Sequence, residues 1–140
     1  MINGSAMCSS FKKQLLTGAH NFLAHQFFMA LYDDTASLDP DGTTAYVTDG
    51  EISGPGYTAR GQLLTGAQVL ETAQTAYATF NDATWPASSL LARGALIYNH
   101  SSGDAAVAIL DFGADKSSNQ GNFRVKFPPP GPATALIRLQ

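Results

Sequence analysis

The 140-residue chain has little cysteine and little charge. Cys8 is its single cysteine, which excludes an intrachain disulfide and a metal site built from several cysteines. Charged residues make up only 14% of the chain, and 8 Lys and Arg against 11 Asp and Glu give a net charge of −3. Because basic residues are in the minority, the sequence predicts no direct nucleic-acid partner. Because no apolar run reaches the roughly 18 residues of a membrane-spanning helix, it predicts no membrane partner.

Apolar residues are abundant, at 44% of the chain. A single domain of this length can build a core from them without a disulfide or a metal. With so few charges, the outward faces must be covered largely by Ser, Thr, Ala, Gln and Gly. Such a surface is solvated poorly compared with one rich in Lys and Glu, and it is typical of a protein that works inside an assembly.

Short apolar stretches predict a series of β-strands from residue 25 onward. Residues 25–32 are largely apolar on both faces, which is typical of a strand covered on two sides. In 123–127, Arg124 and Lys126 face away from the apolar residues, so one side of that strand is expected in solvent. Further strands are predicted at 44–48, 57–64, 75–80, 91–98, 106–112 and 135–139.

Seven or eight short strands with turn signals between them predict an all-β fold, namely an antiparallel β-sandwich. The long connections at 33–43 and 113–122 favour a jelly-roll-like or Greek-key arrangement over a simple meander. Gly61, inside a predicted strand, indicates a bulge or a bend. The stretch 128–132, Pro-Pro-Pro-Gly-Pro, is expected to be a stiff loop between two strands.

Residues 1–24 differ from the rest and are predicted to form an N-terminal arm with a short helix, while 25–140 form the β-sandwich domain. The helix is expected over 9–18, from a capping serine to Gly18. So short a helix is marginal in water and must pack on something.

The packing partner of this helix stays open at the level of sequence. The helix either caps the open end of its own sandwich or reaches a neighbouring subunit. In the second case its apolar anchors are Phe11, Leu15 and Leu16, of which the first two share one helix face.

No pattern of catalytic residues is present. A G-x-S-x-G nucleophile turn, a phosphate-binding loop and a dinucleotide fingerprint are all absent from the sequence. His20, His25 and His100 lack the spacing of metal ligands and are interpreted as ordinary loop or edge residues. We therefore predict that the protein is not an enzyme and has no catalytic residue, no metal site and no cofactor.

Four acidic residues crowd the connection between residues 33 and 43, which raises the possibility of a calcium site. The helical calcium loop that Asp39 would begin requires a carboxylate at its twelfth position, where Gly50 stands. Aspartate and glycine are also favoured in turns for backbone reasons, so a solvated turn is the preferred interpretation. The four residues are Asp33, Asp34, Asp39 and Asp41.

Arg60 and Arg93 each precede a glycine within a predicted strand. A planar guanidinium at such a place can pair with an acid on a partner protein. An internal pair, for example with Asp82 or Asp111, is the favoured alternative.

Several phrases carry a resemblance to a known group of proteins. They include Glu-Ile-Ser-Gly-Pro-Gly-Tyr-Thr-Ala at 51–59, Ala-Arg-Gly-Ala-Leu-Ile-Tyr-Asn at 92–99 and Phe-Arg-Val-Lys-Phe at 123–127. Across roughly 25–139 the chain resembles small virion proteins of tailed bacteriophages. In length and β-content it is most similar to the capsid cement, or decoration, proteins of short-tailed phages. Shorter phrases that belong to the same resemblance lie at 30–32, 43–46, 84–85 and 110–113.

The resemblance implies a jelly-roll sandwich that forms a homodimer on the outer capsid surface of the virion. There it would bridge neighbouring major capsid protein subunits against internal DNA pressure, without catalysis or a cofactor. The alternative is a phage tail or fibre component, or a β-sandwich that binds host glycans. A glycan binder requires an exposed aromatic platform, for which the candidates are Trp85, Tyr46, Tyr57 and Tyr98.

Overall fold

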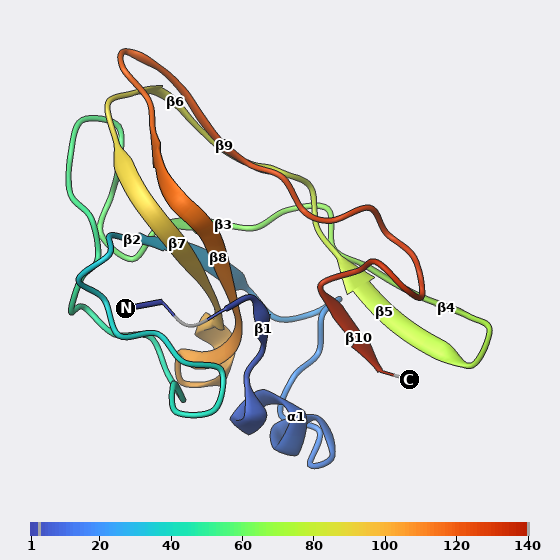
Figure 1. Cartoon of the computed structure of the whole chain (residues 1–140). Coiled ribbons are helices and arrows are strands. Elements are labelled where there is room, and N and C mark those ends of the chain that lie inside the picture. Colours follow the sequence, from blue (N-terminus) through green and yellow to red (C-terminus); the bar gives the residue numbers. More distant parts are fainter. Residues whose placement is uncertain (3, 140) are drawn as a thin grey trace.

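The computed structural model describes residues 1–2 and 4–139. Strands make up 43% of it and helix 7%, which confirms the prediction of an all-β sandwich with a short N-terminal helix (Figure 1). The elements are β1 (Ala6–Met7), α1 (Ser9–Leu15), β2 (Phe27–Tyr32), β3 (Gln62–Leu63), β4 (Gln68–Thr72), β5 (Thr75–Thr79), β6 (Ala83–Ser88), β7 (Leu91–Asn99), the 3₁₀ turn η1 (His100–Ser102), β8 (Ala105–Ser117), β9 (Gly121–Val125) and β10 (Ile137–Leu139).

The main layer is a five-stranded antiparallel sheet with the order β1-β8-β7-β2-β3. β7 and β8 form a hairpin, but β2 pairs with β7 and β1 with β8 across long stretches of chain. A simple meander has no such crossovers, so the preference for a crossed-over topology agrees with the structure.

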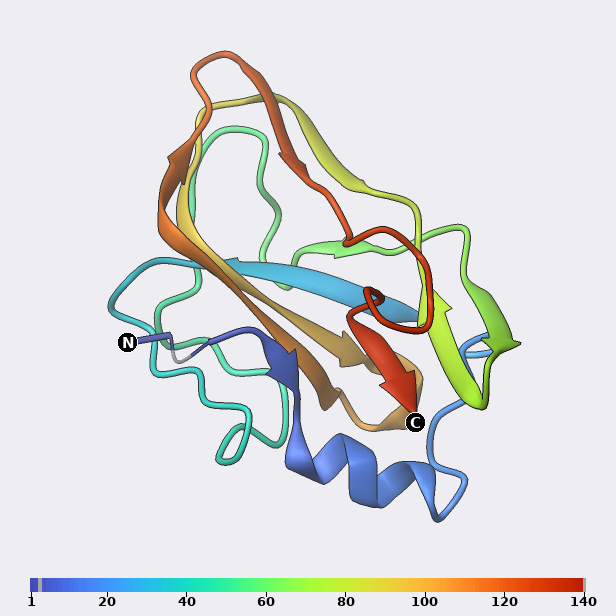
Figure 2. The same ribbon diagram turned by 45° about the vertical axis from the view of Figure 1, so that its right-hand side comes forward.

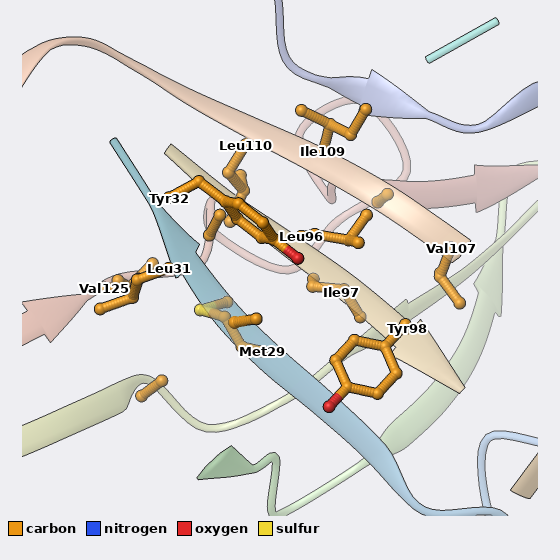
Figure 3. Close-up of a cluster of buried hydrophobic side chains, with 14 of the residues drawn as sticks. Met29, Leu31, Tyr32, Leu96, Ile97, Tyr98, Val107, Ile109, Leu110 and Val125 are labelled. Atoms are coloured by element: carbon orange, nitrogen blue, oxygen red, sulfur yellow. The ribbon is translucent and has the colours of Figure 1, made fainter. Parts of the chain in front are cut away.

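The core lies on this main sheet because its central strands are apolar on both faces. All residues of β2 except Phe28 are buried, and so are Ala95 to Asn99 of β7. Figure 3 shows the side chains of these strands packed against one another and against Val125 from the second layer. The prediction that the strand at 25–32 is covered on both sides is confirmed.

The second layer consists of a three-stranded sheet with the order β10-β5-β4 and a two-stranded ribbon of β6 and β9. In Figure 2 the ribbon runs from the far end of the β7–β8 hairpin toward β5 and β10. Trp85 pairs with Phe123, and Ala83 with Val125, and all four side chains are buried. Arg124 is exposed, as the alternation in 123–127 predicted.

Some predicted strands are absent or shorter than expected. Residues 44–48 make only an isolated bridge, from Ala45 to Ala105, and 57–64 contributes only the two residues of β3. Side-chain hydrogen bonds, described below, hold this part of the chain instead of a strand ladder. β1, β4 and β6 were not predicted.

Gly61 lies at a bend, as predicted. Its φ is +83°, and its N–H donates to the Thr58 carbonyl 3.0 Å away, which closes a turn just before β3. A Cβ at this position would lie 1.8 Å from the Met29 carbonyl oxygen of β2, so only glycine fits.

Residues 1–24 pack on the same main sheet as the rest of the chain. β1 extends that sheet at the edge of β8, and α1 follows immediately across its end (Figure 1). α1 ends at Leu15, three residues before the predicted end at Gly18. The Cys8 thiol is fully buried beside α1, and burial raises its pKa to about 11, which keeps it in the unreactive thiol form.

Candidate functional site

The predicted anchors of α1 divide between the core and the surface. Phe11 is fully buried, with its ring centroid 4.9 Å from that of His20 and 5.9 Å from that of Phe22. This residue therefore fastens α1 to its own chain. Leu15 is half-buried, and the side chain of Leu16 is 90% exposed. Of the three, only Leu15 and Leu16 face outward.

An apolar groove of about 150 Å³ lies between α1 with its following loop and the three-stranded sheet. Val69 of β4, Ala78 of β5 and Ile137 of β10 lie side by side in the register of that sheet, so their side chains share one face. The exposed lining of the groove is apolar. The residues that line it are Phe11, Leu15, Phe22, Val69, Ala76, Tyr77, Ala78, Ile137, Arg138 and Leu139.

Exposed apolar side chains concentrate on the elements that build this groove. Of the nine large apolar side chains exposed among the described residues, five come from α1, its following loop, β4 and β10. The five are Leu16 (90% exposed), Leu23 (72%), Val69 (48%), Leu70 (42%) and Leu139 (48%). We call these residues, together with the groove, the apolar surface. Val69 and Leu139 line the groove, whereas Leu70, the residue after Val69 on β4, faces the other side of the sheet. Groups of exposed apolar side chains on soluble proteins mark interaction sites.

β4 adds an open sheet edge to the apolar surface. It is the last strand of the order β10-β5-β4, and all five of its residues are exposed. Its only charged residue is Glu71, and it lacks the lysines and prolines with which natural sheets block edge pairing. Such an edge presents unpaired backbone groups to another strand.

The charged residues on the elements that build the groove are mostly basic. Lys12 and Lys13 are exposed on α1, and Arg138 of β10 lines the groove itself. Glu71 of β4 is the single acid among these elements. In a chain with a net charge of −3, the apolar surface therefore has a locally basic rim.

Arg60 and Arg93 both have internal acidic partners. Arg60 pairs with Asp104 at 2.5 Å, and Arg93 with Asp115 at 3.5 Å. The preference for internal pairing agrees with these contacts, but the two acids suggested from the sequence are engaged elsewhere. Asp82 pairs with Arg124 at 2.9 Å and accepts the Phe127 N–H, and Asp111 accepts the N–H groups of Gly4 and Gly113.

Arg60 lies in a turn, not in a strand, and it belongs to a network centred on Glu51. The Glu51 carboxylate accepts the Tyr46 and Tyr57 hydroxyls and, at 2.7 Å, the Arg60 backbone N–H. The Arg60 guanidinium lies over the Tyr46 ring, 4.6 Å from its centroid, and the Tyr98 hydroxyl donates to the Arg60 carbonyl at 2.6 Å. This network ties the loop 33–61 to the main sheet.

The four aromatic residues proposed as a glycan platform are occupied in other ways. Trp85 and Tyr98 are buried, so neither ring offers an exposed face. Tyr46 and Tyr57 are half-buried, with their hydroxyls donated to Glu51. These residues form no exposed aromatic platform.

The acidic loop is organised by turns. An oxygen of Asp33 accepts the Thr35 N–H, Asp39 accepts the Asp41 N–H, and Asp41 accepts the Ser9 hydroxyl. In the described part of the chain, no group of three or more His, Cys, Asp or Glu side chains is arranged to hold a metal ion. Within the same part, no helix has the length and apolar character needed to cross a membrane.

Sequence reasoning missed the sheet half of the apolar surface. Leu15 and Leu16 were found as apolar anchors of the predicted helix, on which Leu15 shares one face with Phe11. Val69 and Leu139 became candidates only when folding placed β4 and β10 on either side of β5. A hint lay in the adjacent apolar pair Val69 and Leu70 between two turn signals.

Comparison of the chain with protein-family models, with curated proteins and with solved structures gives no significant match.

Proposed function

We propose that this chain is a structural virion protein that binds the outer surface of a phage capsid as a homodimer. In this role it cements neighbouring major capsid protein subunits against internal DNA pressure. The proposal rests on the resemblance of its sequence phrases to tailed-phage virion proteins and on one structural observation, the apolar surface.

We assign the members of the apolar surface that lie outside β4, namely Leu16, Leu23 and Leu139, to the contact with the capsid shell. Burying a leucine side chain contributes about 1.5–3 kcal/mol, so covering Leu16, Leu23 and Leu139 supplies a substantial part of a stable contact. The basic rim of Lys12, Lys13 and Arg138 favours a shell surface on which apolar residues are bordered by carboxylates.

The rest of the molecule is suited to carrying mechanical load between two such contacts. The central strands of the main sheet are buried on both faces, and the Glu51 network ties the longest loop to this sheet. A dimer that holds two capsid subunits makes the second contact intramolecular, so each contact can be weak while the pair is strong.

The open edge of β4 is the contact that we assign to the second copy. Two β4 strands related by a two-fold axis would pair antiparallel and satisfy each other's backbone groups. Wild-type protein is expected to sediment as a dimer and Leu70→Lys as a monomer, because a lysine at an edge blocks pairing. A monomeric wild type would contradict this part of the proposal.

The shell contact is tested by binding to capsids that lack the protein. The variant Leu16→Ser/Leu139→Ser is expected to lose affinity on the order of a hundredfold, because two exposed leucines that the proposed contact would bury are replaced by polar residues. Leu91→Ser is the matched control, since Leu91 is 54% exposed on β7, outside the apolar surface. Equal binding by wild type and the double variant would overturn the assignment.

Cementing itself is tested on whole particles. Particles that carry the wild-type protein are expected to release DNA at a higher temperature than particles without it. A density map of the particle is expected to place many copies on the outer shell. A few copies located only on the tail would contradict the capsid role and support a tail or fibre component.

A further inference from the structure

Two histidines that the sequence left without a role meet one buried amide. Asn99, at the end of β7, is fully buried, and its side-chain oxygen accepts the Ser101 N–H at 3.0 Å. Its amide nitrogen therefore faces the other way, where it lies 2.9 Å from Nδ1 of His20 and 3.0 Å from Nδ1 of His25. We call these three side chains the histidine latch.

The latch requires both imidazole rings to be neutral. Because the Asn99 amide group is a donor, each Nδ1 must accept and cannot carry a proton. The Nε2 atom of His20 lies 2.7 Å from the side-chain oxygen Oε1 of Gln14 and donates to it. The Nδ1 atom of His25 also accepts the Asn21 backbone N–H at 3.1 Å. A proton added at either Nδ1 would point at an N–H donor.

The latch is the main polar tie between residues 19–25 and the main sheet. The backbone hydrogen bonds recorded for this segment go only to Gln14 and Asn21, which lie on α1 and within the segment itself. Its other anchor is apolar, because Phe22 stacks on Phe27 of β2 with 4.5 Å between ring centroids. Within the described part of the chain, the two histidine rings are the groups that link the segment to β7 by hydrogen bonds.

The groups that surround the latch offer no acidic partner to a protonated His20 or His25 ring. From α1 the rings meet Gln14 and Phe11, from β2 Phe27 and from β7 Asn99, and all four are uncharged. The charged groups of α1 are Lys12 and Lys13, which are exposed. In η1, His100 is bonded to Asp104 at 2.8 Å. Among the described residues no carboxylate lies within ion-pair distance of His20 or His25.

From this geometry we infer that acidification opens the histidine latch and releases residues 19–25 from the main sheet. Phe22 leaves the groove with them, so the apolar surface loses one wall. As a regulator of the apolar surface, the latch rests on the proposed function. As a conformational switch, it stands on its own hydrogen bonds.

The direction of the pH effect on the latch follows from the linkage between protonation and folding. Burial, and the nearby His25, lower the pKa of His20 below its ordinary value. The latched state thus binds fewer protons than the released state, in which histidine has a pKa of about 6.5. The latch is fully closed above that pH and weakens as the pH falls below it.

Amide hydrogen exchange on the isolated protein tests the switch. Between pH 7.5 and pH 5, after correction for intrinsic exchange, the protection of 19–25 is expected to fall about tenfold. Protection in β7 and β8 is expected to stay within twofold. Unchanged protection of 19–25 in the wild type would overturn the inference.

The three histidines provide their own control. His20→Gln/His25→Gln cannot be protonated and is expected to keep the protection of 19–25 constant over this pH range. His100→Gln, which changes the histidine outside the latch, is expected to behave as the wild type does. A pH-dependent loss in the double variant equal to that of the wild type would overturn the inference.

Ring nitrogen spectra of the wild type give a second readout that needs no variant. At pH 7.5, Nδ1 of both rings is expected to be unprotonated, and protonation is expected to coincide with the loss of protection. Rings that titrate while 19–25 stays protected would contradict the latch.

Binding to empty capsids separates the two proposals. Release of 19–25 without any capsid binding at pH 7.5 would leave the switch standing and contradict the shell contact. Capsid binding at pH 7.5 with no release of 19–25 at pH 5 would support the shell contact and contradict the switch.

Discussion

The main sheet and the three-stranded sheet differ in how far their strands are buried and paired. In the main sheet, β7 is buried along most of its length between two paired neighbours. In the three-stranded sheet, β4 is exposed at every residue and has one free edge. Both belong to one small sandwich, and the same chain builds them. The difference indicates that the first region supplies the stability of the fold and the second supplies its contacts.

The two regions also differ in how their polar and apolar side chains are paired. Around the loop 33–61, hydroxyl, carboxylate and guanidinium groups pair with one another, as Glu51 does with Tyr57 and Arg60. Around the groove, apolar side chains such as Leu139 face solvent next to basic ones. Exposed apolar side chains are unfavourable in water unless a partner covers them. We therefore expect substitutions around the main sheet to lower the stability of the fold, and substitutions in the apolar surface to change stability little and to weaken binding.

The largest effect on stability is expected from the core of the main sheet. Leu96→Ala removes a fully buried side chain of β7 and should lower the free energy of unfolding by about 3 kcal/mol. Val69→Ala, on the exposed β4, should change it by less than about 0.5 kcal/mol. Urea denaturation measures both. Similar losses in the two variants would break the distinction between the regions.

A smaller loss is expected from the Glu51 network. Glu51→Ala leaves the Tyr46 and Tyr57 hydroxyls and the Arg60 N–H without their acceptor, which should cost about 2 kcal/mol. Glu71→Ala removes the same type of side chain from exposed β4 and should cost less than about 0.5 kcal/mol. Equal denaturation midpoints for the two variants would show that the network does not tie the loop.

The tyrosines of this network predict a sensitivity to alkali. Burial raises the pKa of Tyr98 to about 12, and burial with a hydrogen bond to Glu51 raises the pKa of Tyr57. The unfolded chain releases these protons at about pH 10. The folded protein therefore retains protons that the unfolded chain has lost, and its stability falls as the pH rises above 10.

At pH 11 the buried Tyr98 alone should lower the free energy of unfolding by about 1 kcal/mol relative to pH 9. Urea denaturation at the two pH values measures the loss. Tyr98→Phe should reduce the difference between them. A stability that is level from pH 9 to pH 11 would contradict the assignment.

The sequence predicted the main sheet better than the second layer, for a physical reason. Strands buried on both faces require runs such as Leu96-Ile97-Tyr98, and these runs were recognised as strands. β4 is exposed on both faces, so the residues 68–72 show no alternation between apolar and polar positions. β1 has only two residues and is defined by its partner β8, not by its own composition.

The candidate site was predictable only where local spacing defines it. Helical spacing placed Phe11 and Leu15 on one face, and both line the groove, but it gave no reason to expect Phe11 buried and Leu16 exposed. The latch does not follow from local spacing, because Asn99 lies 79 residues from His20 along the chain. Histidine rings with no neighbouring acid in the sequence gave no reason to expect a common partner.

The turn between β4 and β5 was missed for a different reason. Thr72 pairs with Thr75, which leaves Ala73 and Gln74 as a two-residue turn. Their φ values are +50° and +68°, the geometry for which Asn-Gly is the usual sequence. Alanine and glutamine give no such signal, and each occupies a left-handed conformation at a cost of about 1 kcal/mol.

The smallest expected effect is a gain at this turn. Ala73→Asn/Gln74→Gly relieves the left-handed strain and should stabilise the β4–β5 hairpin by about 1 kcal/mol, or fivefold in amide protection. Gln74→Ala keeps the strain and should give no gain. Because no strand of the three-stranded sheet is hydrogen-bonded to the main sheet in the described residues, the gain should appear in β4 and β5 and leave β7 unchanged. An equal rise throughout the chain would mean that the two regions open together, and no rise at all would mean that the turn is unstrained.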